Sequence, residues 1–394
     1  MTPTTLTALG ICCALGQSKQ QVWQNAISAS RAGMQWRSDL LQSGDAVVVG
    51  QVAGQLPDLS AWPAQFQSRN NQLAALAYQQ IAAEVAALRQ QMGSDRIAVI
   101  IGSSTSGIAE GEQAMQHYVQ QQRFPAGFHY QMQEMIAPAE FIAQLANVSG
   151  PCYAISTACS SSARALMSAR NLLLADMADA VIVGGVDSLC RLTLNGFKAL
   201  ESVSAGFCQP FSVNRDGINI GEGAALFVMQ KHQPGIALLG AAASSDAHHM
   251  SAPHPQGRGA VDAIFQACED AAIKPAQLDY INLHGTATPL NDSMESQALV
   301  QLALTQVAAS SSKAMTGHTL GAAGAIEAAL CWLTLSPYNS DNHLIPHCWD
   351  EQQDPDLPAL QLVQPKQRHK VTYCLSNSFA FGGNNVALIL GKTL

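Results

Sequence analysis

The sequence predicts an α/β protein whose strands are buried on both faces. Short apolar runs bounded by glycine alternate with longer segments of helical periodicity along the 394 residues, and continuous apolar strands are typical of sheets that helices cover on both sides. No repeat with a period of roughly 20 to 50 residues recurs strongly, so nothing suggests a solenoid or a propeller. We expect strands, in chain order, at 97–101, 180–183, 224–229, 280–283 and 386–390.

Four segments have the spacing of apolar residues that predicts helices. Alanines and leucines recur at this spacing in 71–91, and 163–174 and 260–272 follow the same pattern, whereas 321–335 is rich in small residues and is expected to be buried. Between these elements, we expect a long polar loop at 118–135, able to shape a pocket or a dimer face. A segment rich in proline and glutamine at 336–368 is expected to be a surface excursion.

A polar stretch with a proline near 230–235 is the best boundary within the chain. It divides the chain into an N-terminal half, 1–234, and a C-terminal half, 235–394. The candidate functional residues described below are distributed over both halves.

Composition indicates an oligomer and argues against a nucleic-acid-binding protein. Apolar residues make up 48% of the chain and charged residues only 12%, which is little charge for a soluble monomer and suggests that a partner subunit covers much of the surface. The formal net charge is −8, and no cluster of five lysines or arginines occurs. Binding of nucleic-acid phosphates would require a basic stripe.

The ten cysteines are scattered through the chain. They form neither a CxxC pair nor a spacing typical of zinc sites, so we expect no metal site and no disulfide framework, and the thiols indicate a reducing compartment. Residues 1–16 lack the pattern of a secretion signal, and no run approaches the roughly 20 apolar residues that span a bilayer. We therefore expect a soluble, cytoplasmic protein without membrane insertion. Seven cysteines among apolar neighbours are expected to be small buried residues: Cys12, Cys13, Cys152, Cys190, Cys268, Cys331 and Cys374.

A candidate nucleophile lies in the segment Tyr-Ala-Ile-Ser-Thr-Ala-Cys-Ser-Ser-Ser-Ala, residues 153–163. A strand-like run passes here through small residues into a helical pattern, and Cys159 falls at the turn. A thiol at a helix N-terminus meets unpaired backbone N–H groups and the positive end of the helix dipole, which favour the reactive thiolate. The segment alone also allows a second interpretation, a buried structural cysteine in a tight turn.

Two histidines follow expected strands in the C-terminal half. His284 lies in His-Gly-Thr-Ala-Thr, and His318 lies in Lys-Ala-Met-Thr-Gly-His-Thr-Leu-Gly-Ala-Ala-Gly, residues 313–324. Each histidine alone is more often a structural residue, but open α/β folds bind ligands at the carboxyl ends of their strands, and the small neighbours leave room for a ligand. The glycines near 221–224 and 317–324 match neither a dinucleotide-binding motif nor a P-loop.

Taken together, these segments resemble the β-ketoacyl-acyl carrier protein synthases, the elongating ketosynthases of type II fatty acid and polyketide pathways. The similarity also includes Gly-Gly-Val-Asp-Ser at 184–188, the stretch 209–224 and Ser-Asn-Ser-Phe-Ala-Phe-Gly-Gly-Asn-Asn at 376–385, so it runs through most of the chain. The resemblance implies a thiolase-like fold of five layers, α-β-α-β-α, built from two similar halves. It also implies a homodimer with its active sites near the interface.

The resemblance implies a reaction as well. Cys159 would take an acyl chain from the phosphopantetheine arm of an acyl carrier protein, and His284 and His318 would support decarboxylation of a malonyl carrier protein, whose carbanion attacks the acyl thioester. The backbone N–H groups of Cys159 and Phe381 match the oxyanion hole of the family. No cofactor is implied for the enzyme itself, because the carrier protein holds the substrates.

Further residues match supporting positions of the family. Lys313 and Glu327 match a charged pair around the histidine loop, and Phe379 and Phe381 match the aromatic residues that gate the acyl pocket. A structural ion-pair network or a place in the core is an equally open interpretation of these residues.

Four other residues match the family near the site and at its entrance. Asp292 and Glu295 match acidic positions that follow the first histidine, and a structural ion-pair network is as open an interpretation of them as direct proton transfer. Arg69 and Lys198 match positions near the tunnel mouth, where positive charge would dock the acidic carrier protein, although a solvated surface charge is the alternative.

Three departures from the family pattern leave the range of substrates open. Ala287 replaces a glycine in the first histidine loop, Cys208 stands where a basic residue often precedes the Pro-Phe pair, and Ala380 replaces a frequent glycine between the two phenylalanines. We expect synthesis of either fatty acids or a secondary metabolite such as a polyene.

Two alternative functions remain. A chain-length factor, the catalytically silent subunit of a ketosynthase heterodimer, has the same fold, but the retained cysteine and both histidines argue against it. A thiolase or a synthase primed by coenzyme A commonly has a second cysteine or an asparagine in place of one histidine. The two histidine loops therefore favour the elongating ketosynthases.

Overall fold

The computed structural model describes residues 3–393. In chain order, the strands are β1 (Thr4–Cys13), β2 (Met34–Arg37), β3 (Val47–Gly50), β4 (Ile97–Gly102), β5 (Cys152–Ile155), β6 (Ala180–Asp187), β7 (Gly223–Lys231), β8 (Gly235–Ser245), β9 (Tyr280–Asn282), β10 (Ala308–Ser310), β11 (Tyr373–Ala380) and β12 (Asn384–Thr393). The α-helices are α1 (Lys19–Ile27), α2 (Arg69–Gln79), α3 (Ala82–Met92), α4 (Ile108–Gln121), α5 (Ala137–Ala146), α6 (Ser161–Leu174), α7 (Arg191–Ala199), α8 (Arg258–Asp270), α9 (Pro289–Gln301), α10 (Lys313–Thr316) and α11 (Ala323–Leu335).

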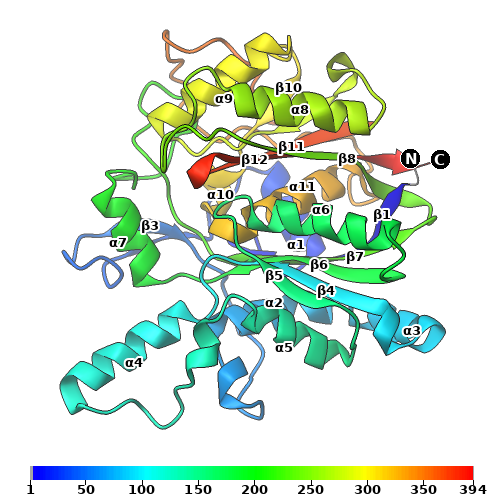
Figure 1. The fold of residues 1–394 in the computed structure, drawn as a ribbon. Coiled ribbons are helices and arrows are strands. Elements are labelled where there is room, and N and C mark those ends of the chain that lie inside the picture. The colour runs from blue at the N-terminus through cyan, green and yellow to red at the C-terminus, as the bar shows by residue number, and fades with distance from the viewer. Residues whose placement is uncertain (1–2, 394) are drawn as a thin grey trace.

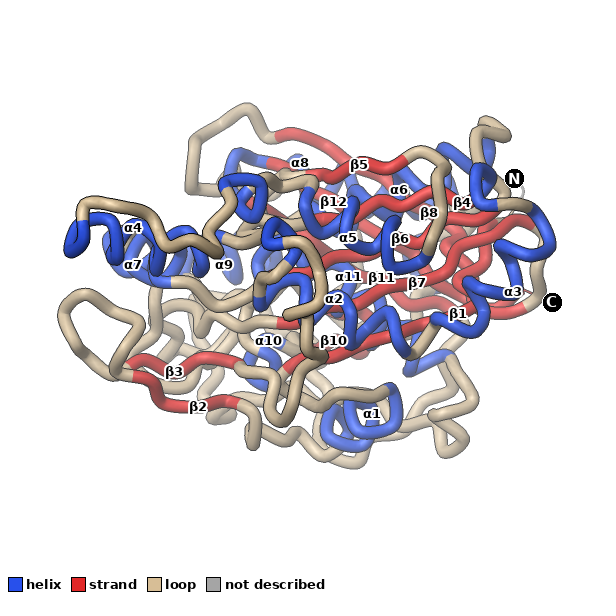
Figure 2. The backbone as a smooth tube through the Cα atoms, turned by 90° about the horizontal axis from the view of Figure 1, so that it is seen from below, coloured by secondary structure: helices blue, strands red, loops and turns tan. Residues whose placement is uncertain are grey.

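The strands of the large sheet run through the body of the molecule (Figure 2). Their order is β10-β9-β11-β12-β8-β1-β7-β6-β4-β5, and the sheet consists of two halves with the same pattern of strands. In one half, β4 runs parallel to β5 and β6, and the antiparallel strands β7 and β1 follow. In the other, β9 runs parallel to β10 and β11, and the antiparallel strands β12 and β8 follow. The halves meet where β1 pairs with β8. The division of the chain at residue 234, just before β8, stays a prediction.

Helices lie on both outer faces and between the two halves (Figure 1). Helices α2 and α5 pack against the first half of the sheet, and α8 packs against the second, with α9 beside it. Helices α6 and α11 lie in the middle and contact strands of both halves. Helix α11 is almost wholly buried, and its residues are apolar or small apart from Glu327 and Thr334, as expected of a helix enclosed between the two halves of the sheet. The five-layer thiolase-like fold is thus confirmed.

All five expected strands are present as β4, β6, β7, β9 and β12, and their ends differ from the expected ones by only a few residues. Three of the expected helices correspond to α6, α8 and α11. Six of the seven cysteines expected to be buried are buried, whereas Cys152 is half-buried on β5, the edge strand. All ten cysteines lie among the described residues, and each is a free thiol.

The prediction of a single helix at 71–91 is wrong, because the helix is interrupted between α2 and α3. The Nε2 atom of Gln80 donates hydrogen bonds to the backbone oxygens of Ile11 and Gln17 at 2.9 and 3.2 Å. The next residue, Ile81, has φ −118° and ψ −1°, outside the helical range. Contacts with the N-terminal segment thus end a helix that the local pattern would continue.

The polar loop expected at 118–135 is wrong in its first part, because α4 continues to Gln121. Glutamine is a good helix former, so a glutamine-rich polar sequence does not by itself predict a loop. A short 3-10 turn, Tyr130–Gln133, follows the remaining loop. Among residues 3–393, no helix combines the length and the apolar character needed to cross a bilayer.

Candidate active site

Cys159 lies in the turn between β5 and α6, two residues before the helix begins at Ser161. The preceding residue, Ala158, has a left-handed backbone with φ +52°. Its carbonyl oxygen accepts hydrogen bonds from the backbone N–H and the side-chain hydroxyl of Ser161, and from the hydroxyl of Ser104 at 3.3 Å. These bonds stabilise the turn that carries the thiol, which is only 7% exposed.

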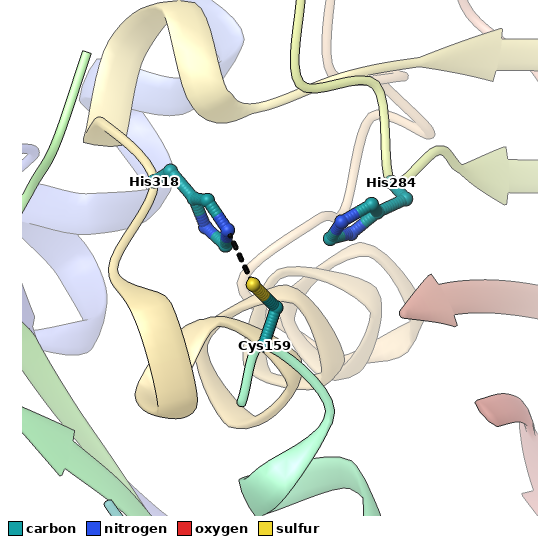
Figure 3. A group of neighbouring side chains, drawn as sticks. All are labelled: Cys159, His284 and His318. Atoms are coloured by element: carbon teal, nitrogen blue, oxygen red, sulfur yellow. Dashed lines mark hydrogen bonds between the residues drawn. The ribbon is translucent and has the colours of Figure 1, made fainter. Parts of the chain in front are cut away.

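The two histidines converge on the cysteine from separate loops (Figure 3). His284 follows β9, and His318 lies between α10 and α11. The Nε2 atom of His318 is 3.0 Å from Sγ of Cys159, and the two imidazole rings meet edge to face with 5.5 Å between their centres. The structure therefore brings together the three residues that the sequence predicted from distant segments.

Lys313 and Glu327 form a buried pair behind His284. The Nζ atom of Lys313 lies 3.3 Å from Nδ1 of His284 and donates to the carbonyl oxygen of the same residue at 2.5 Å. It also donates to Oε1 of Glu327, which lies on α11. An ammonium group can donate hydrogen bonds but cannot accept them. Nδ1 of His284 must therefore accept the hydrogen bond from Lys313, and Nε2 must carry the ring proton. The pair thus fixes the tautomer in which His284 can donate a hydrogen bond.

The imidazole of His318 lacks such a partner. Its Nδ1 atom is buried and has no hydrogen-bond partner among the described residues. Neither tautomer of His318 is therefore fixed by a neighbouring group, and its Nε2 atom can either accept or donate a proton.

Burial dominates the ionisation of the three groups. It raises the pKa of the Cys159 thiol to about 11, against the opposing effects of the Lys313 charge and the Phe381 backbone N–H. Burial, followed by the charge of Lys313, also holds the pKa values of His284 and His318 well below their usual range. The expected thiolate at the helix N-terminus is corrected here, because burial outweighs the stabilising groups. These directions favour a thiol and two neutral imidazoles at neutral pH.

Glu295 and Asp292 hold the loop of His284. The two oxygens of Glu295 accept the backbone N–H groups of His284 and Gly285, each at 2.8 Å. Asp292 accepts the backbone N–H groups of Phe211 and Ala287 at 2.8 and 3.2 Å. Both carboxylates are fully buried, and neither lines the cavity beside Cys159. Their geometry favours the structural interpretation over direct proton transfer.

A cavity of about 320 Å³ opens beside the three residues. Its wall includes Phe379 and Phe381, and the ring of Phe381 lies 5.6 Å from that of Phe197 on α7. The backbone N–H of Phe381 interacts with the sulfur of Cys159 and lowers its pKa, which suits an oxyanion-hole donor. The sequence did not single out Phe197; the only available signal was its place directly before Lys198.

The two expected docking residues differ in their surroundings. Lys198 is exposed on α7, and Phe197 on the same helix and Leu200 directly after it line the cavity. Arg69 instead donates two hydrogen bonds to the fully buried Glu222, at 2.8 and 2.5 Å. It faces a second groove, between α4 and α7, and does not line the cavity of Cys159.

The departures from the family pattern have different structural effects. Ala287 adopts φ +64°, a left-handed conformation that glycine would adopt without strain. Hydrogen bonds from its N–H to Asp292 and from Gly217 to its carbonyl oxygen hold it there. Cys208 is buried beside Ala287, and Ala380 has an ordinary extended backbone.

The ligand atoms of Cys159, His284 and His318 all lie within 4.8 Å of one another. Among residues 3–393, no other group of three histidine, cysteine or acidic side chains meets this condition. One thiolate and two imidazoles are a donor set that soft divalent metals accept. The expectation that the protein works without a metal stays a prediction.

Comparison with known proteins agrees with this geometry. The family models for the N-terminal and C-terminal domains of β-ketoacyl synthases match residues 1–234 and 236–339. The chain is 28% identical to 3-oxoacyl-[acyl-carrier-protein] synthase 2 of Staphylococcus aureus, with 98% of this chain and 97% of the relative covered. It is 30% identical to the synthase of the same name from Synechocystis sp., with the same coverage.

Among solved structures, one chain of a complex between a ketosynthase, ApeO, and its chain length factor, ApeC, from Xenorhabdus doucetiae is similar throughout. It is 44% identical with a TM-score of 0.95, and the match covers 100% of this chain and 98% of the other. The fold, the sequence matches and the cysteine with its two histidines agree. This chain belongs to the β-ketoacyl synthase family, whose members are acyl-transferring condensing enzymes.

Proposed function

We propose that the protein transfers an acyl chain from an acyl carrier protein to Cys159 and condenses it with malonyl carrier protein, with loss of carbon dioxide. The observation that carries this proposal is the 3.0 Å approach of His318 Nε2 to Cys159 Sγ, beside an imidazole whose tautomer Lys313 fixes. A thiol of raised pKa needs a neighbouring base to become a nucleophile, and His318 is within reach to act as one.

In the first half-reaction, His318 Nε2 accepts the proton of the Cys159 thiol as sulfur attacks the thioester carbonyl. The backbone N–H groups of Cys159 and Phe381 stabilise the oxyanion, and the proton passes to the departing carrier thiol. The products are an acyl-Cys159 thioester and a free carrier thiol. The unpartnered Nδ1 of His318 supports this step, because the ring can exchange tautomers without breaking a hydrogen bond.

In the second half-reaction, both imidazoles donate from Nε2 to the thioester carbonyl of malonyl carrier protein. Negative charge develops on this oxygen as the carboxylate leaves as carbon dioxide, and donors at that position lower the barrier. The resulting enolate carbon attacks the acyl-Cys159 carbonyl, the bond from that carbonyl to sulfur breaks, and the Cys159 thiolate leaves and takes up a proton from water. The product is a β-ketoacyl carrier protein whose acyl chain is two carbons longer than the one that Cys159 held.

We also propose that the active form is a dimer that covers β5 and the segment around α4. Strand β5 is a half-buried edge of the large sheet, directly before the nucleophile turn. Helix α4 and the following loop project from the body (Figure 1) and carry stacked rings of Tyr118, Phe124 and Phe128. Val119 and Tyr130 are 66% and 69% exposed, and so large an apolar surface favours a protein partner.

The second subunit is a related chain or a second copy. The complex of ApeO with ApeC supports a heterodimer, whereas the resemblance to the synthases of fatty acid elongation supports a homodimer. Sedimentation of the chain alone, and after co-expression with a related chain, distinguishes the two. The free thiols favour the reducing cytoplasm as the compartment, and the carrier-bound substrates require no cofactor.

A second candidate function is a chain-length factor without activity of its own. The similarity to a chain of the ApeO–ApeC complex favours it as far as the fold is concerned. The experiment that decides is incubation with acyl carrier proteins bearing saturated, unsaturated and aryl chains, followed by intact-protein mass measurement. One added acyl group supports the enzyme, and an unchanged mass with every chain favours the silent subunit.

A further inference from the structure

The carboxylate of Asp187 lies between the loop of Cys159 and the loop of His318. Asp187 ends β6 and is fully buried. Its Oδ1 atom accepts four hydrogen bonds, from Ser103 Oγ at 2.9 Å, from the backbone N–H groups of Ser104 and Thr105 at 2.8 Å each, and from Thr105 Oγ1 at 2.7 Å. Its Oδ2 atom accepts the backbone N–H of Ala322 at 3.0 Å.

Each carboxylate oxygen of Asp187 is linked by hydrogen bonds to a segment that carries one of the two reacting residues, Cys159 or His318. On one side, Ser104 donates its hydroxyl to the carbonyl oxygen of Ala158, the residue directly before Cys159. On the other side, Ala322 ends the short 3-10 turn Leu320–Ala322 that follows His318 and leads into α11. The side chain of Asp187, at the end of β6, therefore connects the turn of Cys159 with the loop of His318. The separation of these two segments sets the distance from Cys159 Sγ to His318 Nε2.

We propose that Asp187 is a positioning residue for the condensing reaction, holding the turn of Cys159 and the loop of His318 at the separation that the thiol and the imidazole require. The proposal rests on the proposed function in one respect only, namely that Cys159 is the nucleophile. Asp187 touches neither reacting group and acts through Ser104 and Ala322.

The charge of Asp187 gives the positioning role a measurable consequence, because it affects the pKa of Cys159. Burial raises the pKa of Asp187, and the five neutral donors that surround its carboxylate oppose this shift because they favour the ionised form. The negative charge is one of the causes that raise the pKa of Cys159. Loss of the charge should therefore lower that pKa, even while loss of the hydrogen bond disturbs the geometry.

Two variants separate charge from position. Asp187→Asn removes the charge and turns an amide N–H₂ or a weaker acceptor toward the N–H of Ala322. Gly321→Ala keeps the charge, but its new Cβ would lie 2.6 Å from Ser104 Oγ and 2.9 Å from Asp187 Oδ2, which forces the carboxylate away from Ala322. Asp279→Asn is the control, because the half-buried Asp279 likewise accepts backbone N–H groups, from Thr372 and Tyr373, but lies directly before β9, at the end of that strand away from His284.

The experiment measures two quantities for each variant: the rate of acyl transfer from an acyl carrier protein to Cys159, and the pH midpoint of Cys159 alkylation by iodoacetamide. A displacement of about 1 Å can cost on the order of 100-fold in rate, so we expect at least about tenfold slower transfer in both site variants. The alkylation midpoint should move to lower pH in Asp187→Asn and stay in place in Gly321→Ala. The control should change neither quantity.

Wild-type transfer and an unmoved midpoint in Asp187→Asn would overturn the proposal. If Asp187→Asn does not fold, Gly321→Ala provides the test. Acyl transfer to Cys159 at the wild-type rate in Gly321→Ala would also overturn the proposal. If the wild-type protein accepts no acyl group but the midpoint still moves in Asp187→Asn, the proposed function fails while the link from Asp187 to Cys159 stands.

Discussion

The Nε2 atom of His318 lies 3.0 Å from the Sγ atom of Cys159, although the two residues are 159 positions apart in the chain. The thiol comes from the start of a central helix of the first half, and the imidazole comes from a loop of the second half. Their meeting requires both halves to be folded and packed on each other. The chemistry thus depends on the same central layer, α6 and α11, that joins the two halves.

Lys313 should matter more for decarboxylation than for acyl transfer. Lys313→Met removes the donor that fixes the His284 tautomer, and loss of one oxyanion donor typically costs about 10²- to 10³-fold in rate. We expect release of carbon dioxide from malonyl carrier protein to fall by this order, with a smaller effect on acylation of Cys159. Lys313→Met combined with Glu327→Gln avoids leaving Glu327 buried without its cation. Decarboxylation within about twofold of wild type in both variants would contradict the tautomer argument.

His347 should make folding stability depend on pH. Burial lowers its pKa to about 4, and its Nδ1 accepts the backbone N–H of Ser311 while Nε2 donates to Pro210 O. The unfolded chain binds a proton below about pH 6.5 and the folded chain does not, so the contribution is complete above that pH and decreases as the pH falls toward 4. This residue alone should cost about 2 kcal/mol between pH 7 and pH 5.

Urea unfolding at pH 7 and pH 5 measures this effect. His347→Gln should lose less stability than wild type on acidification, by about the amount attributed to His347. The exposed His369, changed to Gln, is the control and should leave the wild-type difference in place. Equal losses in wild type and His347→Gln would refute the assignment.

Lys198 and Arg69 should respond differently to charge reversal. Lys198→Glu leaves the interior unchanged and should raise the Michaelis constant for carrier-bound substrate at low salt, where charge steering is strongest. Arg69→Glu would leave Glu222 buried beside a second carboxylate, and breaking such a pair costs about 3–5 kcal/mol. We expect a lower melting temperature in this variant, whatever its effect on docking.

The exposed Lys274 lies directly before the 3-10 turn Pro275–Gln277, and its change to Glu controls for overall charge. A Michaelis constant that is the same in Lys198→Glu and Lys274→Glu would exclude Lys198 from docking. A wild-type melting temperature in Arg69→Glu would show that the pair with Glu222 contributes little to stability.

The residues of the site could be predicted from the sequence because each lies in a short local pattern and these patterns together resemble the β-ketoacyl synthases. Cys159 stands where a strand passes into a helix, and both histidines lie in loops rich in small residues. The ionisation of Cys159 could not be predicted in the same way, because burial is a property of the complete fold. The pairing of Arg69 with Glu222, 153 positions away, and the contact of Gln80 with Ile11, 69 positions away, are likewise invisible to local patterns.

Intact-protein mass measurement after incubation with acyl and malonyl carrier proteins tests the central claim most directly, when wild type, Cys159→Ala and His318→Ala are compared. Wild type should gain one acyl group and then release a β-ketoacyl product. Cys159→Ala should gain none but still release some carbon dioxide from malonyl carrier protein, and His318→Ala should lose decarboxylation more than acylation. Condensation by Cys159→Ala at the wild-type rate would contradict the account.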